Sequence, residues 1–267
     1  MTLTHDPSTE LPLPTTDEAL FAPDTDIEAL TRHWAAQAQL RAITGEAMTG
    51  VDTRAQRSGT PGDRLMEEAG TATAAAARAL MVSMDRPPDS LVLILCGPGN
   101  NGGDGLVAAR RLADVGIRSE VVMLANVAPS KRDAGRNWER LEGIAGVERV
   151  FAPRGHDAAL FLNGIERAGL VIDAMLGSGV QGALREPVLT AVDLAVRARD
   201  SGVPVLAVDT PTALDLTSGV PSDPVVRADV TITFHRPKQG HQSALGKLLA
   251  GRVLVAPIGI PIEADPG

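Results

Sequence analysis

The sequence has 267 residues, of which 44% are hydrophobic and 22% are charged, and this balance is typical of a chain that folds into one large α/β domain. Its formal net charge is −8, and it has no cluster of Lys and Arg interleaved with aromatic residues, which excludes nucleic acid as an expected partner. No apolar run reaches the roughly 18 residues that a membrane span needs, the N-terminus has no signal-peptide pattern, and Cys96 is the single cysteine. We therefore expect a protein of the reducing cytoplasm that has no membrane partner.

The N-terminal part is predicted to be a tail followed by three helices. Residues 1–24 carry four prolines among Thr, Asp and Glu, a composition that buries too little surface to fold. We therefore expect a disordered tail over 1–24 and one folded domain over 25–267. Apolar residues recur at helical spacing after residue 26, beginning with Ile27, Leu30 and Trp34, and they predict helices over 26–43, 45–57 and 63–83.

A glycine-rich loop between a strand and a helix dominates the centre of the sequence. The apolar run 91–95 predicts a short buried strand, the loop 97–102 follows, and helical spacing begins at Gly103 with Asp104 in the first turn. Glycines leave room for a ligand to approach backbone N–H groups at a helix N-terminus. The loop is therefore a candidate binding site, and a tight turn that uses Asn and Gly only for their positive φ angles is the alternative.

This loop matches two nucleotide-binding motifs only in part. Residues 97–102 match G-x-G-x-x-G, but the next predicted strand, 120–124, runs into Ala125 and Asn126 where a dinucleotide site has its ribose-binding acid. A Walker A loop requires Lys and then Ser or Thr after Gly102, where this chain has Gly103 and Asp104. The sequence thus disfavours a redox dehydrogenase and excludes a P-loop.

Strands and helices alternate over the remaining chain. The predicted strands are 120–124, 148–151, 170–172, 203–208, 230–234 and 252–256, and the predicted helices are 130–144, 157–167 and 187–201. This alternation predicts an α/β fold with a mostly parallel sheet and helices on both faces. Polar clusters follow three strands, namely the glycine loop, 173–179 and 209–215. Because such sheets bind ligands at the carboxyl ends of their strands, we expect these clusters to form one site.

Several blocks of the sequence together resemble the YjeF N-terminal domain family, whose enzymatic members are NAD(P)HX epimerases. The most specific block is Asn-Asn-Gly-Gly-Asp-Gly at 100–105, and the others lie at 65–70, 171–179, 209–212, 228–238 and 258–261. The resemblance implies a Rossmann-like three-layer αβα sandwich with a mostly parallel central sheet, often a homodimer. It also implies interconversion of the R and S forms of hydrated NADH and NADPH (NADHX and NADPHX) for metabolite repair, with a potassium ion as cofactor.

The resemblance also implies roles for individual positions. It gives the acid/base role to Asp209, and Asp104 is our second candidate for that role, since one carboxylate can both deliver and remove a proton in turn. It gives the potassium ion to Asn101, Asp173 and Thr212. The substrate-binding residues that it implies are Asn100, Asn101, Gly102, Gly103, Asp104, Gly177, Ser178, Gly179, Val180, Gln181, Gly182, Ala183 and Asp209.

Two positions depart from the family pattern. Thr212-Ala213 stands where the family usually has Ser-Gly, and the Cβ of Ala213 is expected to cost about 1 kcal/mol if the loop needs a positive φ there. Glu68 replaces the usual Asn, and we expect it to place a negative charge near the site or to pair with Arg64.

The sequence leaves two functions open. The intact glycine loop, Asp173 and Asp209 favour the epimerase. The alternative is a non-catalytic nucleotide-binding or protein-interaction module, which Ala213, Glu68 and the additional helix around Trp34 favour. Packing of that helix on its own sheet would make it structural, and packing on a second copy would indicate a dimer. No kinase-like dehydratase domain is recognised, so we expect a separate NAD(P)HX dehydratase to act downstream.

Overall fold

The protein is described from a computed structural model that covers residues 11–130, 132–177 and 183–265. Within these ranges the chain forms a seven-stranded sheet in which every strand pair is parallel. The strands are β1 (Val92–Cys96), β2 (Ser119–Met123), β3 (Val147–Phe151), β4 (Leu170–Ala174), β5 (Val205–Val208), β6 (Val230–Phe234) and β7 (Arg252–Ala256).

The strand order is β3-β2-β1-β4-β5-β6-β7. From β1 the chain builds outwards to β3, then crosses to β4 on the other side of β1 and builds outwards to β7. The loops that leave β1 and β4 diverge for this reason, and α/β sheets open a binding crevice at such a point. The register pairs Leu95 of β1 with Asp173 of β4, so the glycine loop and the second polar cluster begin side by side.

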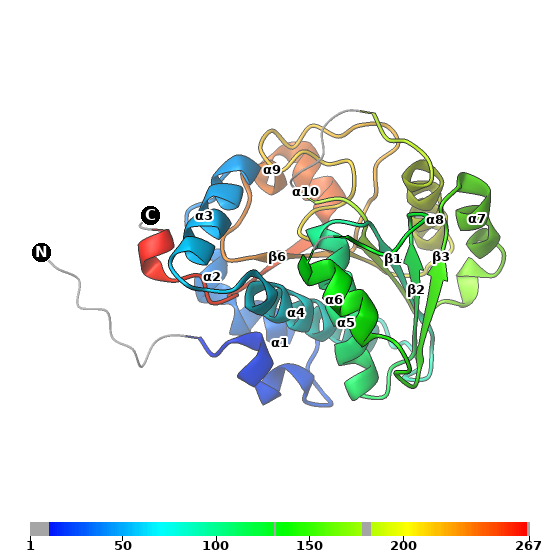
Figure 1. The fold of residues 1–267 in the computed structure, drawn as a ribbon, viewed down its shortest axis with the longest axis horizontal. Helices are drawn as coiled ribbons and strands as arrows, with labels where there is room; N and C mark the ends of the chain where they lie inside the picture. Colours follow the sequence, from blue (N-terminus) through cyan, green and yellow to red (C-terminus); the bar gives the residue numbers. More distant parts are fainter. Residues whose placement is uncertain (1–10, 131, 178–182, 266–267) are drawn as a thin grey trace, which may run out of the picture.

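Helices cover both faces of the sheet, and the predicted three-layer α/β architecture is confirmed (Figure 1). Ile94 and Cys96 of β1 face a core shared with α1, α4, α5 and α6, whereas Leu93 and Leu95 face a core shared with α7 and α8, because successive strand residues point to opposite faces. The helices are α1 (Ile27–His33), α2 (Ala35–Ala38), α3 (Gly45–Arg57), α4 (Gly62–Ser83), α5 (Asn100–Asp114), α6 (Arg132–Arg140), α7 (Gly155–Ala159), α8 (Val188–Asp200), α9 (Gln239–Gln242) and α10 (Ala244–Ala250).

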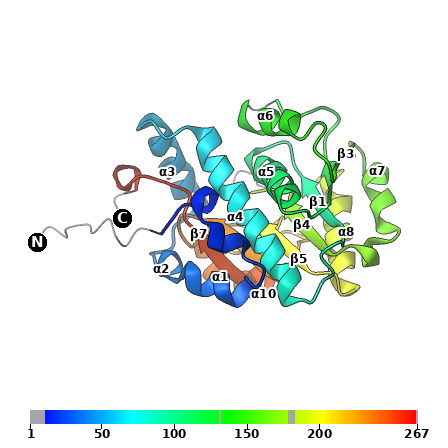
Figure 2. The same cartoon turned by 90° about the horizontal axis from the view of Figure 1, so that it is seen from below.

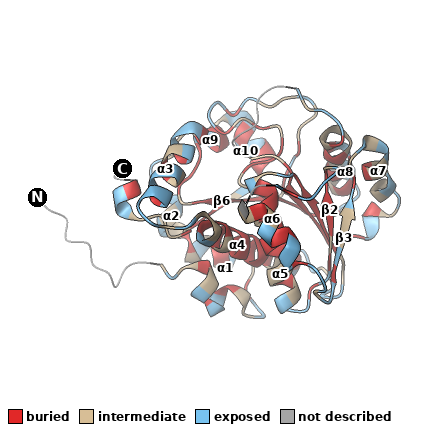
Figure 3. Ribbon diagram, in the orientation of Figure 1, coloured by how far each residue is buried: buried red, intermediate tan, exposed pale blue. Residues whose placement is uncertain are grey.

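The helices α4 and α5 lie side by side across one face of the sheet (Figure 2). Small residues allow this close approach, since a Cβ atom on Gly70 would lie 2.3 Å from the Cβ of Val107. The central strands are buried along their lengths (Figure 3), and Cys96 is a fully buried free thiol, as the sequence predicts. In the described ranges, no helix combines the length and the apolarity that crossing a membrane would require.

Three observed helices differ from the predicted ones. The helix predicted over 26–43 is interrupted at Trp34, whose side chain is 1% exposed in the core on its own sheet, so this helix is structural. The helix predicted over 157–167 is reduced to α7 and two 3-10 turns, because Gly164 adopts a left-handed φ of 90°. The helix α5 begins at Asn100, three residues before the predicted start, because Gly99 already serves as its N-cap.

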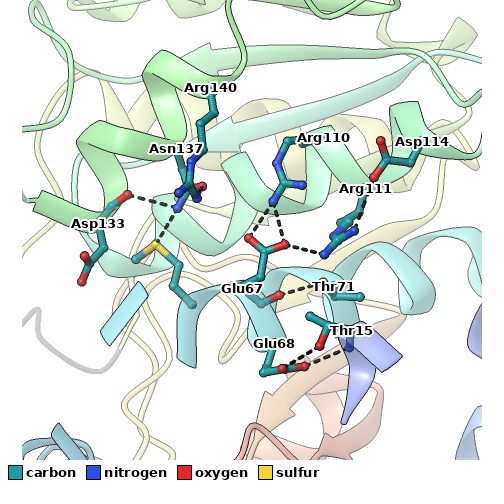
Figure 4. Close-up of polar contacts among 11 residues, drawn as sticks. Thr15, Glu67, Glu68, Thr71, Arg110, Arg111, Asp114, Asp133, Asn137 and Arg140 are labelled. Carbon is teal, nitrogen blue, oxygen red and sulfur yellow. Dashed lines mark hydrogen bonds and ion pairs between the residues drawn. The ribbon is translucent and has the colours of Figure 1, made fainter. Parts of the chain in front are cut away.

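The N-terminal segment 11–24 is ordered, which corrects the expected disordered tail over that part. It forms 3-10 turns at Pro14–Thr16 and Glu18–Phe21 and buries Leu20 at 1% exposure. Glu68 of α4, which is 2% exposed, accepts hydrogen bonds from the backbone N–H of Thr15 at 2.9 Å and from its hydroxyl at 2.7 Å (Figure 4). Glu68 therefore anchors this segment, and the expected pairing with Arg64 is wrong.

The contact between Thr15 and Glu68 yields a stability prediction. Thr15→Ala removes the hydroxyl from a buried carboxylate, and we expect it to lower the free energy of unfolding by about 1.5 kcal/mol. Thr15→Ser keeps both donors and is the matched control. Urea unfolding of the three proteins, at constant m-value, measures the difference, and equal midpoints for the Ala and Ser variants would contradict the anchoring role.

Candidate active site

The structure brings the three polar clusters together at the carboxyl ends of β1, β4 and β5. The N–H of Gly97 donates to the carbonyl of Ala174 at 3.1 Å, and the N–H of Leu176 donates to the hydroxyl of Thr212 at 3.1 Å. A Cβ atom on Gly177 would lie 3.3 Å from the side chain of Asn101. Residues from all three loops are thus in direct contact, as the topology predicts.

Two glycines of the loop serve packing inside the protein. A Cβ atom on Gly102 would lie 1.8 Å from the carbonyl oxygen of Gly97, and one on Gly103 would lie 2.5 Å from the side chain of Met66 in α4. No heavy atom lies within 4 Å of the corresponding position at Gly99. Close approach of a ligand is therefore possible over Gly99, whereas Gly102 and Gly103 allow the loop to fold back on the protein.

The first turn of α5 presents free backbone donors to this region. Gly99 caps the helix without a side-chain hydrogen bond, and the N–H of Gly103 is the first to bond back, to Gly99 at 3.0 Å. In the described part of the chain, no acceptor is paired with the N–H groups of Asn100, Asn101 and Gly102. Such a helix N-terminus attracts anionic or carbonyl groups.

Asp173 is a fully buried carboxylate at the end of β4. It accepts hydrogen bonds from the N–H and the hydroxyl of Thr212, both at 2.7 Å, and from the N–H of Met175 at 3.2 Å. Burial raises the pKa of Asp173 to about 6, against the opposing effect of these donors. Its hydrogen bonds join the loop after β4 to the loop after β5.

Asn101, Asp173 and Thr212 supply hard oxygen atoms in one place. Asp173 and Thr212 are in contact, and Asn101 lies next to Gly177 on the same loop as Met175. The amide nitrogen of Asn101 is buried and has no partner among the described residues, so the amide group has hydrogen-bonding capacity to spare. This set of oxygen atoms suits a hard, oxygen-preferring cation better than a soft transition metal.

Asp209 follows β5 in a strained backbone conformation, with φ at 61°. Its Oδ1 accepts a hydrogen bond from the hydroxyl of Thr233 at 2.8 Å and lies 3.3 Å from the Nζ of Lys238. Burial alone would raise the pKa of Asp209, but the Lys238 ammonium and the Thr233 hydroxyl outweigh burial and hold this pKa below its usual value. Asp209 is therefore ionised at neutral pH.

Two further carboxyl groups lie close enough to Asp209 for its charge to affect their pKa values. The pKa of Asp104 in α5 lies well above its usual value, first because of its burial and then because of the negative charges of Asp209 and Asp52. Asp52 in α3 has its pKa raised to about 6 by burial and by Asp209, with Lys238 opposing. Three neighbouring carboxyl groups thus titrate in different pH ranges.

Sequence analysis missed four residues of this cluster. Asp52 and Thr233 lie in a predicted helix and a predicted strand that assign them no role, and Lys238 follows that strand within one of the family-like blocks. His241 has no paired spacing with another histidine, yet it is 4% exposed and neither ring nitrogen has a partner among the described residues. Burial and the charge of Lys238 lower the pKa of His241 to about 4. The position of Lys238 in a Pro-Lys pair just after a predicted strand was the available signal.

The remaining substrate-binding candidates lie on the loop after β4. Gly177 is half-buried beside Asn101, and Ala183 is exposed. Ser178, Gly179, Val180, Gln181 and Gly182 lie outside the described residues.

Ala213 adopts a positive φ of 77°. This conformation favours Gly, which the family pattern usually has at this position. The left-handed region costs a non-glycine residue about 1–2 kcal/mol, and a Gly at this position removes that cost. Gly also makes the unfolded chain more flexible, which lowers the free energy of unfolding by about 0.4–1 kcal/mol. We expect Ala213→Gly to raise the free energy of unfolding by about 0.5–1 kcal/mol, measured by thermal or urea unfolding. Ala195→Gly, in the helical interior of α8, is the control and is expected to destabilise.

The raised pKa of Asp104 predicts a pH-dependent effect on stability. The unfolded chain releases this proton near pH 4, whereas the folded protein retains it to higher pH, so ionisation favours the unfolded state as the pH rises above about 4. Asp104→Asn removes this penalty. We expect the variant to exceed the wild type in melting temperature at pH 7 and to match it near pH 3.

Differential scanning calorimetry across this pH range tests that expectation. Asp193→Asn, on the exposed side of α8, controls for the loss of a negative charge. A constant difference between Asp104→Asn and the wild type at every pH would contradict the raised pKa.

Comparison with known proteins relates this arrangement to one family. A family model described as YjeF-related protein N-terminus matches residues 62–240. The NAD(P)H-hydrate epimerase of Cenarchaeum symbiosum is 40% identical over 206 residues, which are 76% of this chain and 88% of that protein. The NAD(P)H-hydrate epimerase of Nitrosopumilus maritimus is 32% identical over 84% of this chain and 98% of that protein.

Two other similarities concern a longer relative and a solved structure. The bifunctional NAD(P)H-hydrate repair enzyme Nnr of Pyrobaculum aerophilum is 37% identical over 85% of this chain, but the match spans only 43% of that protein. A crystal structure of yeast ynu0 aligns with a TM-score of 0.65 and 24% identity over 76% of this chain and 84% of that chain. This structural similarity confirms the fold.

Proposed function

Because the chain belongs to the family of YjeF-related protein N-termini, we propose that it is an NAD(P)H-hydrate epimerase, an isomerase that interconverts the R and S forms of hydrated NADH and NADPH. The relatives named as epimerases support this function, since their alignments cover most of both chains. The observation that carries the proposal is a pair of carboxyl groups with opposite pKa shifts: Lys238 and Thr233 lower the pKa of Asp209 after β5, and burial and neighbouring charges raise the pKa of Asp104 in α5.

Epimerisation of the hydrate requires one protonated and one ionised carboxyl group. The hydrate carries a hydroxyl on C6 of the reduced nicotinamide ring, and this carbon epimerises when the C–O bond breaks and a new one forms on the opposite face. Asp104 gives its proton to the leaving hydroxyl, which departs as water while the ring nitrogen supplies its lone pair. Asp209 takes a proton from the incoming water as the new C–O bond forms. Two carboxyl groups with separated pKa values are suited to these roles.

The glycine loop is suited to hold the nucleotide. The free N–H groups at the start of α5 offer donors to an anionic or carbonyl group of the substrate, and Gly99 leaves space above them. The net positive end of the helix dipole adds to this attraction. We propose that Asn100, Asn101 and Gly177 line the same region.

We also propose that Asn101, Asp173 and Thr212 hold a potassium ion. The ion would supply a positive charge that offsets the buried carboxylate of Asp173 and that links the three loops. The oxygen atoms of the Asp173 carboxylate and the Thr212 hydroxyl, which are in contact, and the nearby amide oxygen of Asn101 support this assignment. A dehydratase that consumes one epimer of the hydrate is expected to catalyse the next reaction of the repair. The bifunctional repair enzyme among the relatives is in line with this expectation.

Interconversion of purified NADHX epimers tests the proposed function. We expect the wild type to accelerate the exchange above its spontaneous rate, and Asp209→Asn, which keeps the shape of the side chain, to lower kcat/KM by roughly 10²- to 10⁴-fold. Chromatographic separation of the epimers measures the rate, in potassium and in sodium buffer, with Asp193→Asn as the control. A wild type that binds the nucleotide without accelerating the exchange would instead support the non-catalytic module.

A further inference from the structure

Lys238 carries a charge that is completely buried, at 0% exposure, in the turn between β6 and α9. Its Nζ lies 2.7 Å from the hydroxyl of Thr233, 3.0 Å from the carbonyl of Phe234 and 3.1 Å from the carbonyl of Arg236. An ammonium group has three protons, and these three oxygen atoms accept all of them. The turn is therefore built around the ammonium group of Lys238.

The two hydrogen bonds that link Lys238 to Asp209 through the Thr233 hydroxyl have a fixed direction. Because the Thr233 hydroxyl accepts from Lys238, its single proton is available for Asp209 Oδ1, which it reaches at 2.8 Å. The Nζ of Lys238 lies 3.3 Å from the same oxygen. Oδ1 can only accept in this arrangement, so it carries no proton.

The second oxygen of Asp209 is differently placed. In the part of the chain that the structure describes, Oδ2 takes part in no hydrogen bond or ion pair, and the Asp209 side chain keeps 15% exposure. The left-handed backbone of Asp209 is held by its N–H, which donates to the carbonyl of Ile232 in β6 at 2.7 Å. Strand β6 thus fixes both the backbone and Oδ1 of Asp209, and Oδ2 is left for proton exchange.

We propose that Lys238, acting through Thr233, is the positioning residue that keeps Asp209 as an ionised proton acceptor with Oδ2 directed to the substrate. This inference rests on the proposed epimerase function and adds a role for two residues outside the glycine loop. Proton transfer is balanced over a turnover, since Oδ2 releases to solvent the proton that it takes from the incoming water, and Asp104 regains from solvent the proton that it gives to the leaving hydroxyl. Lys238 and Thr233 exchange no proton with the substrate.

Other titratable groups around Asp209 also influence its ionisation, each in a definite direction. Asp104 of α5 and Asp52 of α3 are still protonated at the pH at which Asp209 titrates, because their own pKa values are higher. His241 of α9 gains its charge only below about pH 4, where it would also favour an ionised Asp209. Lys238 is therefore the cation that determines the ionisation of Asp209 at neutral pH.

The pH dependence of epimerisation in matched threonine variants tests the proposal. Thr233→Val removes the hydroxyl without a large change in shape, and Lys238→Met removes the charge. In both we expect the acidic limb of the kcat/KM profile to move upwards by about one pH unit and kcat to fall roughly tenfold, with KM little changed. Thr233→Ser, which restores the hydroxyl, is expected to bring the limb back towards the wild type.

Thr231→Val is the control for loss of a buried threonine hydroxyl. Thr231 lies two residues earlier on β6 and donates to the carbonyl of Ala250 at 2.7 Å, away from Asp209, so its variant should keep the wild-type pH profile while losing stability. If Lys238→Met does not fold, Thr233→Val alone decides the result.

Two outcomes separate this inference from the proposed function. A Thr233→Val profile that overlays the wild type, or an effect confined to KM, overturns the positioning role and leaves the epimerase intact. A wild type that does not accelerate the exchange overturns both. The Asp209 carboxyl carbon, followed by NMR in the free protein, gives a second readout, and an unshifted titration in Thr233→Val likewise contradicts the proposal.

Discussion

The buried carboxylate of Asp173 requires hydrogen-bond donors, and the strand ends are arranged to provide them. A carboxylate without water is costly unless its oxygen atoms are paired, and Thr212 supplies two donors from the loop after β5. That requirement draws the β5 loop against β4 and fixes its backbone. The positive φ angles of Asp209 and Ala213 occur on this same loop, so local strain is tolerated where the pairing of a buried charge demands it.

The charges at the site form a second, connected arrangement. One buried ammonium group, that of Lys238, faces Asp209 directly and influences Asp52. Lys238 contacts Asp209 and favours its ionised form, whereas burial and the negative charge of Asp209 dominate at Asp104 and at Asp52, where Lys238 opposes them only in part. Different protonation states thus arise from identical side chains through their surroundings alone.

Sequence patterns were sufficient for the sheet and for the meeting of the loops, because both follow from periodicity and topology. The strand 230–234 was predicted with its observed bounds, and the three polar clusters are in contact. The start of α5 and the break at Trp34 were not predictable, because a cap at Gly99 and a core position for Trp34 depend on tertiary packing. The partners of Glu68 and Lys238 were not predictable, since Thr15 lies far from Glu68 in sequence and the contacts of Lys238 depend on the path of a turn.

The turn that carries Lys238 is itself held by the N-terminal part of the chain. The N–H of Ile43, just before α3, donates to the carbonyl of Pro237 at 3.0 Å, and the N–H of Gln239 donates to the carbonyl of Ile43 at 2.9 Å. These partners come from opposite ends of the sequence, and Arg236 likewise reaches the carbonyl of Arg41 across 195 positions. Contacts of such separation carry a large loop-closure cost and form slowly. Synthesis of the chain must therefore pass Gln239 before Ile43 can hold this turn, and with it the ammonium group beside Asp209, in place.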